Sequence, residues 1–193
     1  MKIFAFALLL AFLVCKISKT DATCMCNDTF DGHSSNVECL MNKQIRLEYK
    51  ASYFYDALAA YFERTSVGKL GFTKFFREAS KEEIDHARSM TSFVNSLGMK
   101  VKFSSVTLTS EDTKSSWNGA KEAVEAAIKK ENLVYGNILC VHRSSNDEAV
   151  QEFLDHFIKE QVKSINDLTI LKSRLSMAED TKLVEFLVDK EFL

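Results

Sequence analysis

Residues 77–90 read Arg77-Glu78-Ala79-Ser80-Lys81-Glu82-Glu83-Ile84-Asp85-His86-Ala87-Arg88-Ser89-Met90 and lie within a long amphipathic pattern. Apolar residues recur around them at the three- and four-residue spacing of an α-helix. Glu83 and His86 interrupt this apolar stripe at positions i and i+3, so both side chains point from one face of a helix. A carboxylate is almost never buried without a partner. The stretch therefore predicts either an exposed face or a buried site that holds a cation or a proton.

The composition favours long helices. The chain has 193 residues, of which 46% are hydrophobic, and it contains no Pro and only six Gly. Residues that break helices are thus nearly absent, and the length suffices for one domain with a sizeable core. The net charge is −2 and no dense Lys/Arg cluster is present. The sequence therefore predicts one all-α domain with no nucleic-acid partner.

The N-terminus has the pattern of a signal peptide. Lys2 provides a short positive region, residues 3–15 form an apolar run, and Thr20 and Ala22 are the small residues expected before a cleavage site. A membrane anchor would need about 20 apolar residues, and this run is shorter. We therefore expect residues 1–22 to be removed, the mature protein to be secreted, and no segment to remain in a membrane.

Cysteine usage agrees with an oxidising compartment, as does a glycosylation sequon at Asn27. Cys24, Cys26 and Cys39 lie close together in the sequence, and Cys140 lies far from them. We expect disulfides from this N-terminal segment to Cys39 or to another subunit, with at least one bridge between subunits. The alternative, a zinc site at the Cys-x-Cys pair, lacks a second pair of ligands.

Four long amphipathic patterns and one short pattern follow the N-terminal segment, and they predict the helices. The long patterns cover about 36–64, 69–97, 115–143 and 147–175, and the short one contains Leu183, Phe186 and Leu187. Only short breaks separate the first pattern from the second and the third from the fourth. Short connections join antiparallel neighbours, so the sequence predicts two helical hairpins.

The connection between the second and third patterns sets the topology. It runs for about 16 residues from Gly98, a predicted left-handed helix cap, to Ser115. Extended, it spans roughly 50 Å, whereas a 28-residue helix is about 42 Å long. It can therefore run the length of the bundle and leave helices two and three parallel. This predicts a ferritin-like four-helix bundle with a long crossover and a short fifth helix over residues 36–193, preceded by a Cys-containing extension over 23–35.

Each of the other three long patterns also carries a polar residue within its apolar stripe. These residues are Glu48, Glu131 and Gln161. Four interruptions at matching depth predict one shared site. A Glu from each of two helices plus a Glu-x-x-His is the pattern of carboxylate di-iron bundles, and oxygen-rich ligands with one imidazole favour iron. The fourth helix lacks the second Glu-x-x-His, so we expect the second iron position to be the weaker one.

The chain resembles a heavy-type ferritin subunit of a secreted, invertebrate-like kind. The likeness covers about residues 36–193 and rests on the stretches 44–53, 81–87 and 160–163 and on Trp117, expected at the opening of helix three. It implies a ferroxidase, which oxidises ferrous iron with O₂, and a hollow shell of twenty-four subunits that stores ferric mineral. The shell would contain this chain alone or together with a light-type ferritin subunit.

The resemblance also implies roles for seven residues. Glu48, Glu83 and His86 would bind the first iron, Glu83 would bridge to a second iron on Glu131, Gln161 would position oxygen or water, Tyr55 would hydrogen-bond at the centre, and Glu82 would pass iron inward.

Other positions depart from the family pattern. The family's three-fold channel is lined by carboxylates, but the corresponding residues here are Gln151 and Leu154, with His142 nearby. The turn before them is short, and we expect Glu152 to supply the missing charge. On the mineral-nucleating surface Asp85 is present, but Arg88 stands where an acidic residue is usual. Leu183 and Leu187 resemble the apolar lining of the four-fold channel.

Three alternatives belong to other classes. A secreted four-helix cytokine would share the signal peptide and the bundle, but it would not need Glu48, Glu83, His86 and Glu131 inside. A storage-only, light-type subunit would lack the catalytic residues, which are all present here. A ferritin-like di-iron oxygenase would keep both Glu-x-x-His motifs, and this chain has one.

Overall fold

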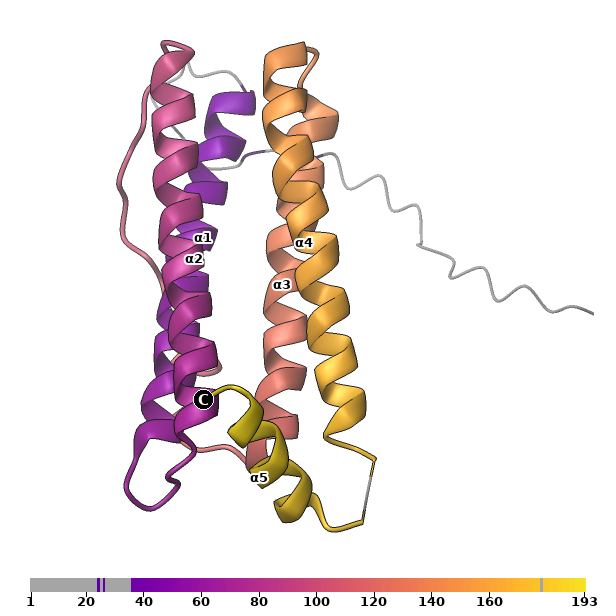
Figure 1. The fold of residues 1–193 in the computed structure, drawn as a ribbon. Coiled ribbons are helices and arrows are strands. Elements are labelled where there is room, and N and C mark those ends of the chain that lie inside the picture. Colours follow the sequence, from indigo (N-terminus) through magenta and orange to yellow (C-terminus); the bar gives the residue numbers. More distant parts are fainter. Residues whose placement is uncertain (1–23, 25, 27–35, 178) are drawn as a thin grey trace, which may run out of the picture.

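The structure, a computed structural model, describes residues 24, 26, 36–177 and 179–193. This part of the chain forms five α-helices: α1 (Asn36–Glu63), α2 (Leu70–Ser96), α3 (Gly119–Ser144), α4 (Glu148–Arg174) and α5 (Thr181–Glu191) (Figure 1). No helix among the described residues is long and apolar enough to cross a membrane. The expected signal peptide (1–22) and the sequon at Asn27 lie outside the described residues.

Two antiparallel hairpins make up the bundle, and a long crossover joins them (Figure 1). α1 packs along α2, α3 packs along α4, and α1 also packs against α3. The segment between α2 and α3 runs along the outside of the bundle from one end to the other, so α2 and α3 are parallel. Gly98 ends α2 with φ +69°, the left-handed conformation expected of it. The predicted all-α topology is confirmed.

The bundle core consists of two apolar regions with a polar layer between them. The buried members of the two regions leave a gap at residues 77–86 of α2, 128–133 of α3 and 158–167 of α4. Large fully buried side chains on either side of the gap include Phe54, Phe62, Phe72, Phe76, Leu40, Met41, Met90, Ile138 and Leu154. Each contributes about 1.5–3 kcal/mol by burial, and together they offset the cost of the buried polar residues in the layer.

The third helix begins later than its amphipathic pattern predicted. α3 starts at Gly119 instead of residue 115, and Trp117 lies in the crossover before it. Gly119 has φ +84°, which an L side chain rarely adopts, and a Cβ there would lie 2.2 Å from Oε1 of Glu185. Trp117 is nevertheless buried, with its carbonyl accepting a 2.7 Å hydrogen bond from Tyr61. The indole packs into the core from the loop. Its burial extended the apolar pattern of α3, which is why the sequence predicted an earlier start of the helix.

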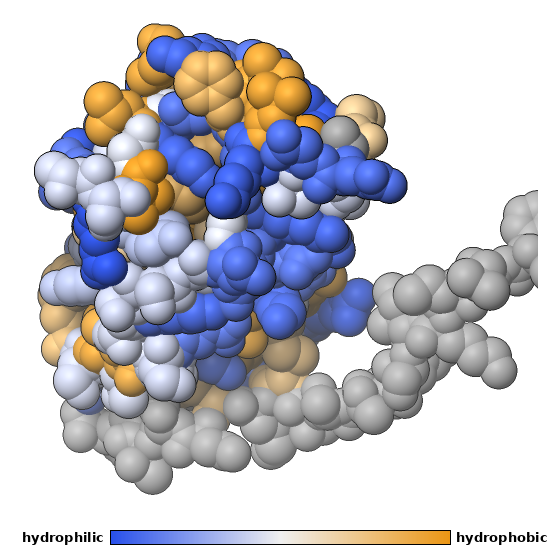
Figure 2. All heavy atoms as spheres, turned by 90° about the horizontal axis from the view of Figure 1, so that it is seen from below, coloured by the Kyte–Doolittle hydropathy of each residue, from blue (hydrophilic) through white to orange (hydrophobic). Residues whose placement is uncertain are grey.

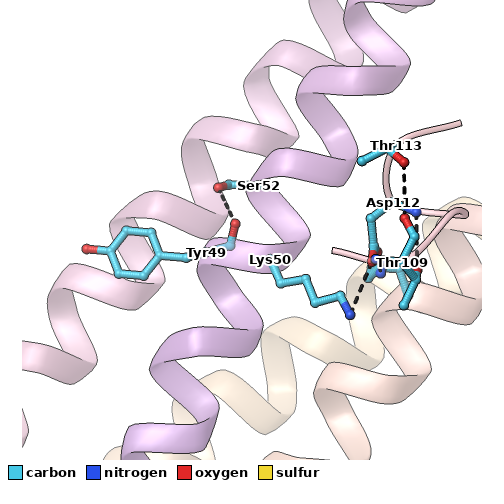
Figure 3. A network of polar contacts seen from close by, with 7 residues as sticks. Tyr49, Lys50, Ser52, Thr109, Asp112 and Thr113 are labelled. Atoms are coloured by element: carbon cyan, nitrogen blue, oxygen red, sulfur yellow. Dashed lines mark hydrogen bonds and ion pairs between the residues drawn. The ribbon is translucent and has the colours of Figure 1, made fainter. Parts of the chain in front are cut away.

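A buried carboxylate fastens the crossover to the bundle (Figure 3). Asp112 accepts hydrogen bonds from the backbone and hydroxyl of Thr109, both at 2.6 Å, which close a local turn. It also pairs with Lys50 of α1, at 3.1 Å, and with Lys130 of α3. Burial alone would raise the pKa of Asp112, but these bonds, that of Lys130 foremost, hold it well below its ordinary value. The crossover is thereby bound to both hairpins.

Both disulfides of the structure lie within one chain. Cys26 pairs with Cys39 of α1, as one of the two expected arrangements, and Cys24 pairs with Cys140 of α3. The expectation of a bridge between subunits is wrong for this arrangement, because it uses all four cysteines of the described residues. The physical reason is that α1 and α3 are neighbours, which brings Cys140 to the start of the chain despite 116 intervening residues.

The fifth helix closes one end of the bundle with its polar side inward. Its buried residues are Glu185, Val188 and Asp189, and it contacts α2 and α3. The outward side carries Leu183, Phe186 and Leu187, each of which exposes more than half of its surface. Figure 2 views this end of the bundle, where hydrophobic side chains lie beside polar ones. The likeness of Leu183 and Leu187 to a channel lining thus remains an expectation about assembled subunits.

Candidate metal centre

The polar layer brings the predicted ligands together from all four long helices. α1 supplies Glu48, α2 supplies Glu83 and His86, α3 supplies Glu131 and α4 supplies Gln161. The exposed fractions of Glu48, Glu83 and Glu131 are 0%, 5% and 2%. Three carboxylates buried at one level carry a large desolvation cost unless protons or cations neutralise them.

Three of these residues form a group that is able to hold a metal ion. One ligand atom each from Glu48, Glu83 and His86 lies within 4.8 Å of the other two. Nδ1 of His86 lies 3.7 Å from Oε2 of Glu83, the contact expected of side chains three residues apart on a helix. Oε2 of Glu48 and Oε2 of Glu83 are buried and have no hydrogen-bond partner. Two free carboxylate oxygens and an imidazole are ligands that suit a divalent cation such as ferrous iron.

The remaining predicted residues form the other half of the site around Glu131. The hydroxyl of Tyr55 donates a hydrogen bond to Oε1 of Glu131, and the amide of Gln161 donates one to its Oε2. The same amide lies 3.2 Å from the Glu131 backbone carbonyl. Both oxygens of Glu131 are thus held by neutral donors, so this carboxylate is kept beside the metal-binding group without belonging to it.

A cavity of about 490 Å³ between α2 and α4 reaches this layer. Side chains that line it include Glu78, Glu82, Glu83, His86, Glu131, Glu160 and Gln161. Glu82 is exposed and lines this cavity, and its role in passing iron inward stays a prediction. Acidic residues from both helices therefore surround the route by which a cation would arrive or leave.

Sequence reasoning missed two residues of the site, Glu160 and Gln44. Oε2 of Glu160 lies 3.6 Å from Nε2 of His86, and its Oε1 lies 3.2 Å from Nε2 of His156. The spacing of His156 and Glu160, four residues apart on one helix, was an available signal. Gln44 donates a 2.6 Å hydrogen bond to Glu48, and its position one turn before Glu48 in the apolar stripe pointed to such a contact.

The carboxylates of the layer resist ionisation in the protein without metal. Burial raises the pKa of Glu48 well above its ordinary value, and the negative charge of Glu83 adds to the effect. Burial, followed by the charge of Glu131, raises the pKa of Glu83 to about 8. Burial also raises the pKa of Glu131, although hydrogen bonds from Tyr55 and Gln161 oppose it. A bound cation would remove the repulsion among these groups and restore their charges.

The residues expected at the three-fold channel and at the mineral-nucleating surface make common surface or core contacts in the single chain. Leu154 is fully buried, and Gln151 donates a 2.9 Å hydrogen bond to the carbonyl of Ser145. Glu152 is exposed, and His142 contacts Asp155 at 3.1 Å. On α2, Arg88 and Asp85 form an exposed ion pair at 3.6 Å. Glu152 as a channel residue stays a prediction, as does the altered nucleation surface.

The fold and the buried side chains together define a helical-bundle protein with an internal group of residues that is able to hold a metal ion. A model of the ferritin-like domain matches residues 38–177. The chain is 33% identical to a ferritin of Pacifastacus leniusculus over 82% of this chain and 89% of that protein, and 34% identical to the soma ferritin of Lymnaea stagnalis over 81% and 90%. A chloroplastic ferritin of Malus baccata var. xiaojinensis is 36% identical over 71% of this chain and 57% of its own.

The chain belongs to the ferritin family. It is therefore grouped with iron-storage proteins, and the expected fold class is confirmed.

Proposed function

We propose that this chain is a ferroxidase subunit of heavy type, which oxidises ferrous iron with O₂ and stores the ferric product. The observation that carries the proposal is the group of Glu48, Glu83 and His86, two of whose buried carboxylate oxygens have no hydrogen-bond partner. A storage-only subunit would have no use for these buried charges, because their burial without a cation is unfavourable.

The first iron would bind to Glu48, Glu83 and His86. The second would lie between Glu83 and Glu131, where it would displace the donors that now hold Glu131. Because α4 offers Gln161 and Ser164 in place of a second Glu-x-x-His, this position has less negative charge and no second imidazole. Weaker binding there suits iron that is a substrate and must leave as product. Tyr55 and Gln161 would orient O₂ or water at the same position.

The redox balance needs two ferrous ions for each O₂ that is reduced to hydrogen peroxide. Each Fe²⁺ loses one electron, and O₂ gains two electrons and two protons. Carboxylates with raised pKa values, such as Glu83, are placed to release protons as iron binds. Glu82 and Glu160, which line the cavity, would then pass ferric iron away from the centre.

The test is rapid-mixing measurement of ferrous oxidation by the purified protein. We expect Glu83→Ala and His86→Ala to lower the initial rate at least tenfold while leaving a folded protein. Glu125→Ala is the matched control, because Glu125 lies on α3 in an exposed pair with Lys172, 3.4 Å away. Unchanged rates in a protein with both Glu83 and His86 replaced would disprove the proposal.

We also propose a secreted shell of twenty-four subunits, formed by this chain alone or with a light-type partner. The proposal is supported by family membership and by the leader-like residues 1–22. Purification from the medium of expressing cells, with N-terminal sequencing and sedimentation analysis, tests it. We expect a mature protein that begins at Thr23 and sediments as a twenty-four-subunit particle. A cell-retained protein that keeps residues 1–22 would contradict the secretion.

A further inference from the structure

A chain of buried amides reaches the metal centre from α3. Asn137 donates a 2.6 Å hydrogen bond from Nδ2 to Oε1 of Gln44, and Gln44 donates a 2.6 Å hydrogen bond from Nε2 to Oε1 of Glu48. The exposed fractions are 8% for Asn137 and 0% for both Gln44 and Glu48. A buried amide is costly unless it is paired, so each of these side chains is held by its neighbour.

The chemistry of the amide group makes this chain directional. A side-chain amide has one end that donates and one that accepts, whereas an ionised carboxylate only accepts. Because Asn137 occupies the accepting end of Gln44, the donating end of Gln44 faces Glu48. Once a cation is bound and Glu48 is ionised, a Gln44 without Asn137 would be free to turn its oxygen toward the carboxylate, and that contact is repulsive.

The two oxygens of Glu48 are thereby distinguished. Oε1 is held by Gln44, and Oε2 is buried without a hydrogen-bond partner. Glu48 also belongs to the group whose ligand atoms converge with those of Glu83 and His86. A carboxylate held at one oxygen presents the other in a fixed direction, which lowers the cost of ordering it around a cation.

We propose that Asn137 is a positioning residue of the metal centre, which acts through Gln44 to reserve Oε2 of Glu48 for a divalent cation. The inference rests on the proposed function, because it concerns the same site. It assigns Asn137 no contact with iron or O₂.

Binding of Co²⁺ tests this without any oxidation step. The probe is Co²⁺ alone, titrated into the metal-free protein and followed by its visible absorption and by calorimetry. The change Asn137→Leu keeps the side-chain size but removes the donor. Loss of a residue that orients a metal ligand costs about 10- to 100-fold in metal affinity, so we expect at least tenfold weaker binding and an altered Co²⁺ spectrum.

A second variant separates positioning from simple packing. Gln44→Met removes the bond to Glu48 itself, so adding Asn137→Leu to it should change the affinity no further. An effect of Asn137 on the centre that does not pass through Gln44 would instead add to that of Gln44→Met. Asn132→Leu is the control, because Asn132 is exposed on the same helix and bonds only locally, to the carbonyl of Ile128 at 2.7 Å. It should bind Co²⁺ as the unmodified protein does.

The outcomes are distinguishable. If Glu83→Ala leaves Co²⁺ binding unchanged, the proposed centre itself is wrong, and the inference falls with it. If Glu83→Ala abolishes binding but Asn137→Leu binds within twofold and with an unchanged spectrum, only the role of Asn137 is overturned. Should Asn137→Leu fail to fold, Asn137→Ala, which also has no donor, is measured by the same criteria, and the same twofold limit overturns the inference.

Discussion

The backbone N–H of Phe72 donates a 2.9 Å hydrogen bond to the Asp189 carboxylate, which joins the first turn of α2 to the terminal helix. Glu185 of the same helix accepts a 2.7 Å bond from the backbone of Ala120 in the first turn of α3 and pairs with Lys69. Neither α2 nor α3 has a side-chain cap from its own N-cap residue. α5 therefore supplies negative charge to two helix N-termini, where the helix dipole favours it.

This arrangement makes Gly71 a sensitive position. A Cβ at Gly71 would lie 1.8 Å from the carbonyl oxygen of Asp189, so Gly71→Ala should push α5 off the bundle. We expect a loss of about 2 kcal/mol in the free energy of unfolding, measured by urea denaturation, because overpacking of this kind costs about 1–3 kcal/mol.

Gly136→Ala is the matched control for Gly71→Ala. Gly136 is also helical, but a Cβ there meets nothing within 4 Å. It should be neutral or stabilising by up to about 1 kcal/mol, the difference in helix propensity. Equal destabilisation by the two changes would show that contact with α5 is not the cause.

The attachment of the crossover to the bundle should depend on Asp112, which pairs with Lys50 and Lys130. Asp112→Ala would leave Lys130 and Lys50, whose side chains are 10% and 19% exposed, without their buried partner. We expect a loss of about 3 kcal/mol in the free energy of unfolding, because breaking a buried ion pair costs about 3–5 kcal/mol. The control Glu63→Ala breaks an exposed pair with Arg77 and should cost less than about 1 kcal/mol. A loss below that of the control would rule out the fastening role.

The metal-free centre should destabilise the fold as the pH rises. Burial and the charge of Glu131 raise the pKa of Glu83 to about 8 in the folded protein, above the ordinary value of 4.5. The proton on Glu83 therefore contributes to the free energy of unfolding. This contribution is fully present below pH 4.5 and is lost as the pH rises toward 8. Glu83→Gln, which stays neutral, should therefore be more stable than the unmodified protein by about 4 kcal/mol at pH 8 and equal to it near pH 4.

The same two proteins, unmodified and Glu83→Gln, are also denatured in the presence of Co²⁺. A ligand at 100 times its Kd adds about 3 kcal/mol to the free energy of unfolding of a protein that binds it. We expect Co²⁺ to stabilise the unmodified protein at pH 8 and to leave Glu83→Gln nearly unchanged. A pH-independent difference between the two metal-free proteins would argue against a buried, repulsive carboxylate cluster.

The sequence predicted the topology and the polar residues that meet inside the bundle, because both depend on regular spacing. Apolar residues at helical intervals located the long helices, and the length of the link after Gly98 fixed the crossover. Glu48, Glu83, Glu131 and Gln161 were found because each interrupts an apolar stripe. Such interruptions are visible without knowing which helices are neighbours.

Features that depend on contacts between distant segments were not predictable in this way. Nothing in the spacing of residues on α3 distinguishes Asn137. Its role is inferred from its 2.6 Å hydrogen bond to Gln44 of α1, which the sequence does not show. Trp117 extended the helical pattern although a positive φ at Gly119 delays the helix. The inward carboxylates of α5 oppose the usual orientation of a terminal amphipathic helix, because the groups that they bind belong to α2 and α3.

Two disulfides tie the N-terminal segment to α1 and α3. Cys24 and Cys140, with Cα atoms 5.5 Å apart, close a loop across 116 residues, and Cys26 and Cys39, 5.9 Å apart, close one across 13. Because both bridges lie within one chain, the purified protein should run as a single-chain band on non-reducing denaturing gels, and none of Cys24, Cys26, Cys39 and Cys140 should react as a free thiol.

Cys140→Ser tests the pairing directly. Loss of the longer loop should lower the free energy of unfolding by about 5 kcal/mol in the chain-entropy account, more than the roughly 3 kcal/mol expected for Cys39→Ser. The change also frees Cys24, which lies ahead of the bundle and can then reach a second chain. We expect a dimer band that disappears with thiol in Cys140→Ser, and none in the unmodified protein. A thiol-sensitive dimer of the unmodified protein would instead show that the pairs form between subunits.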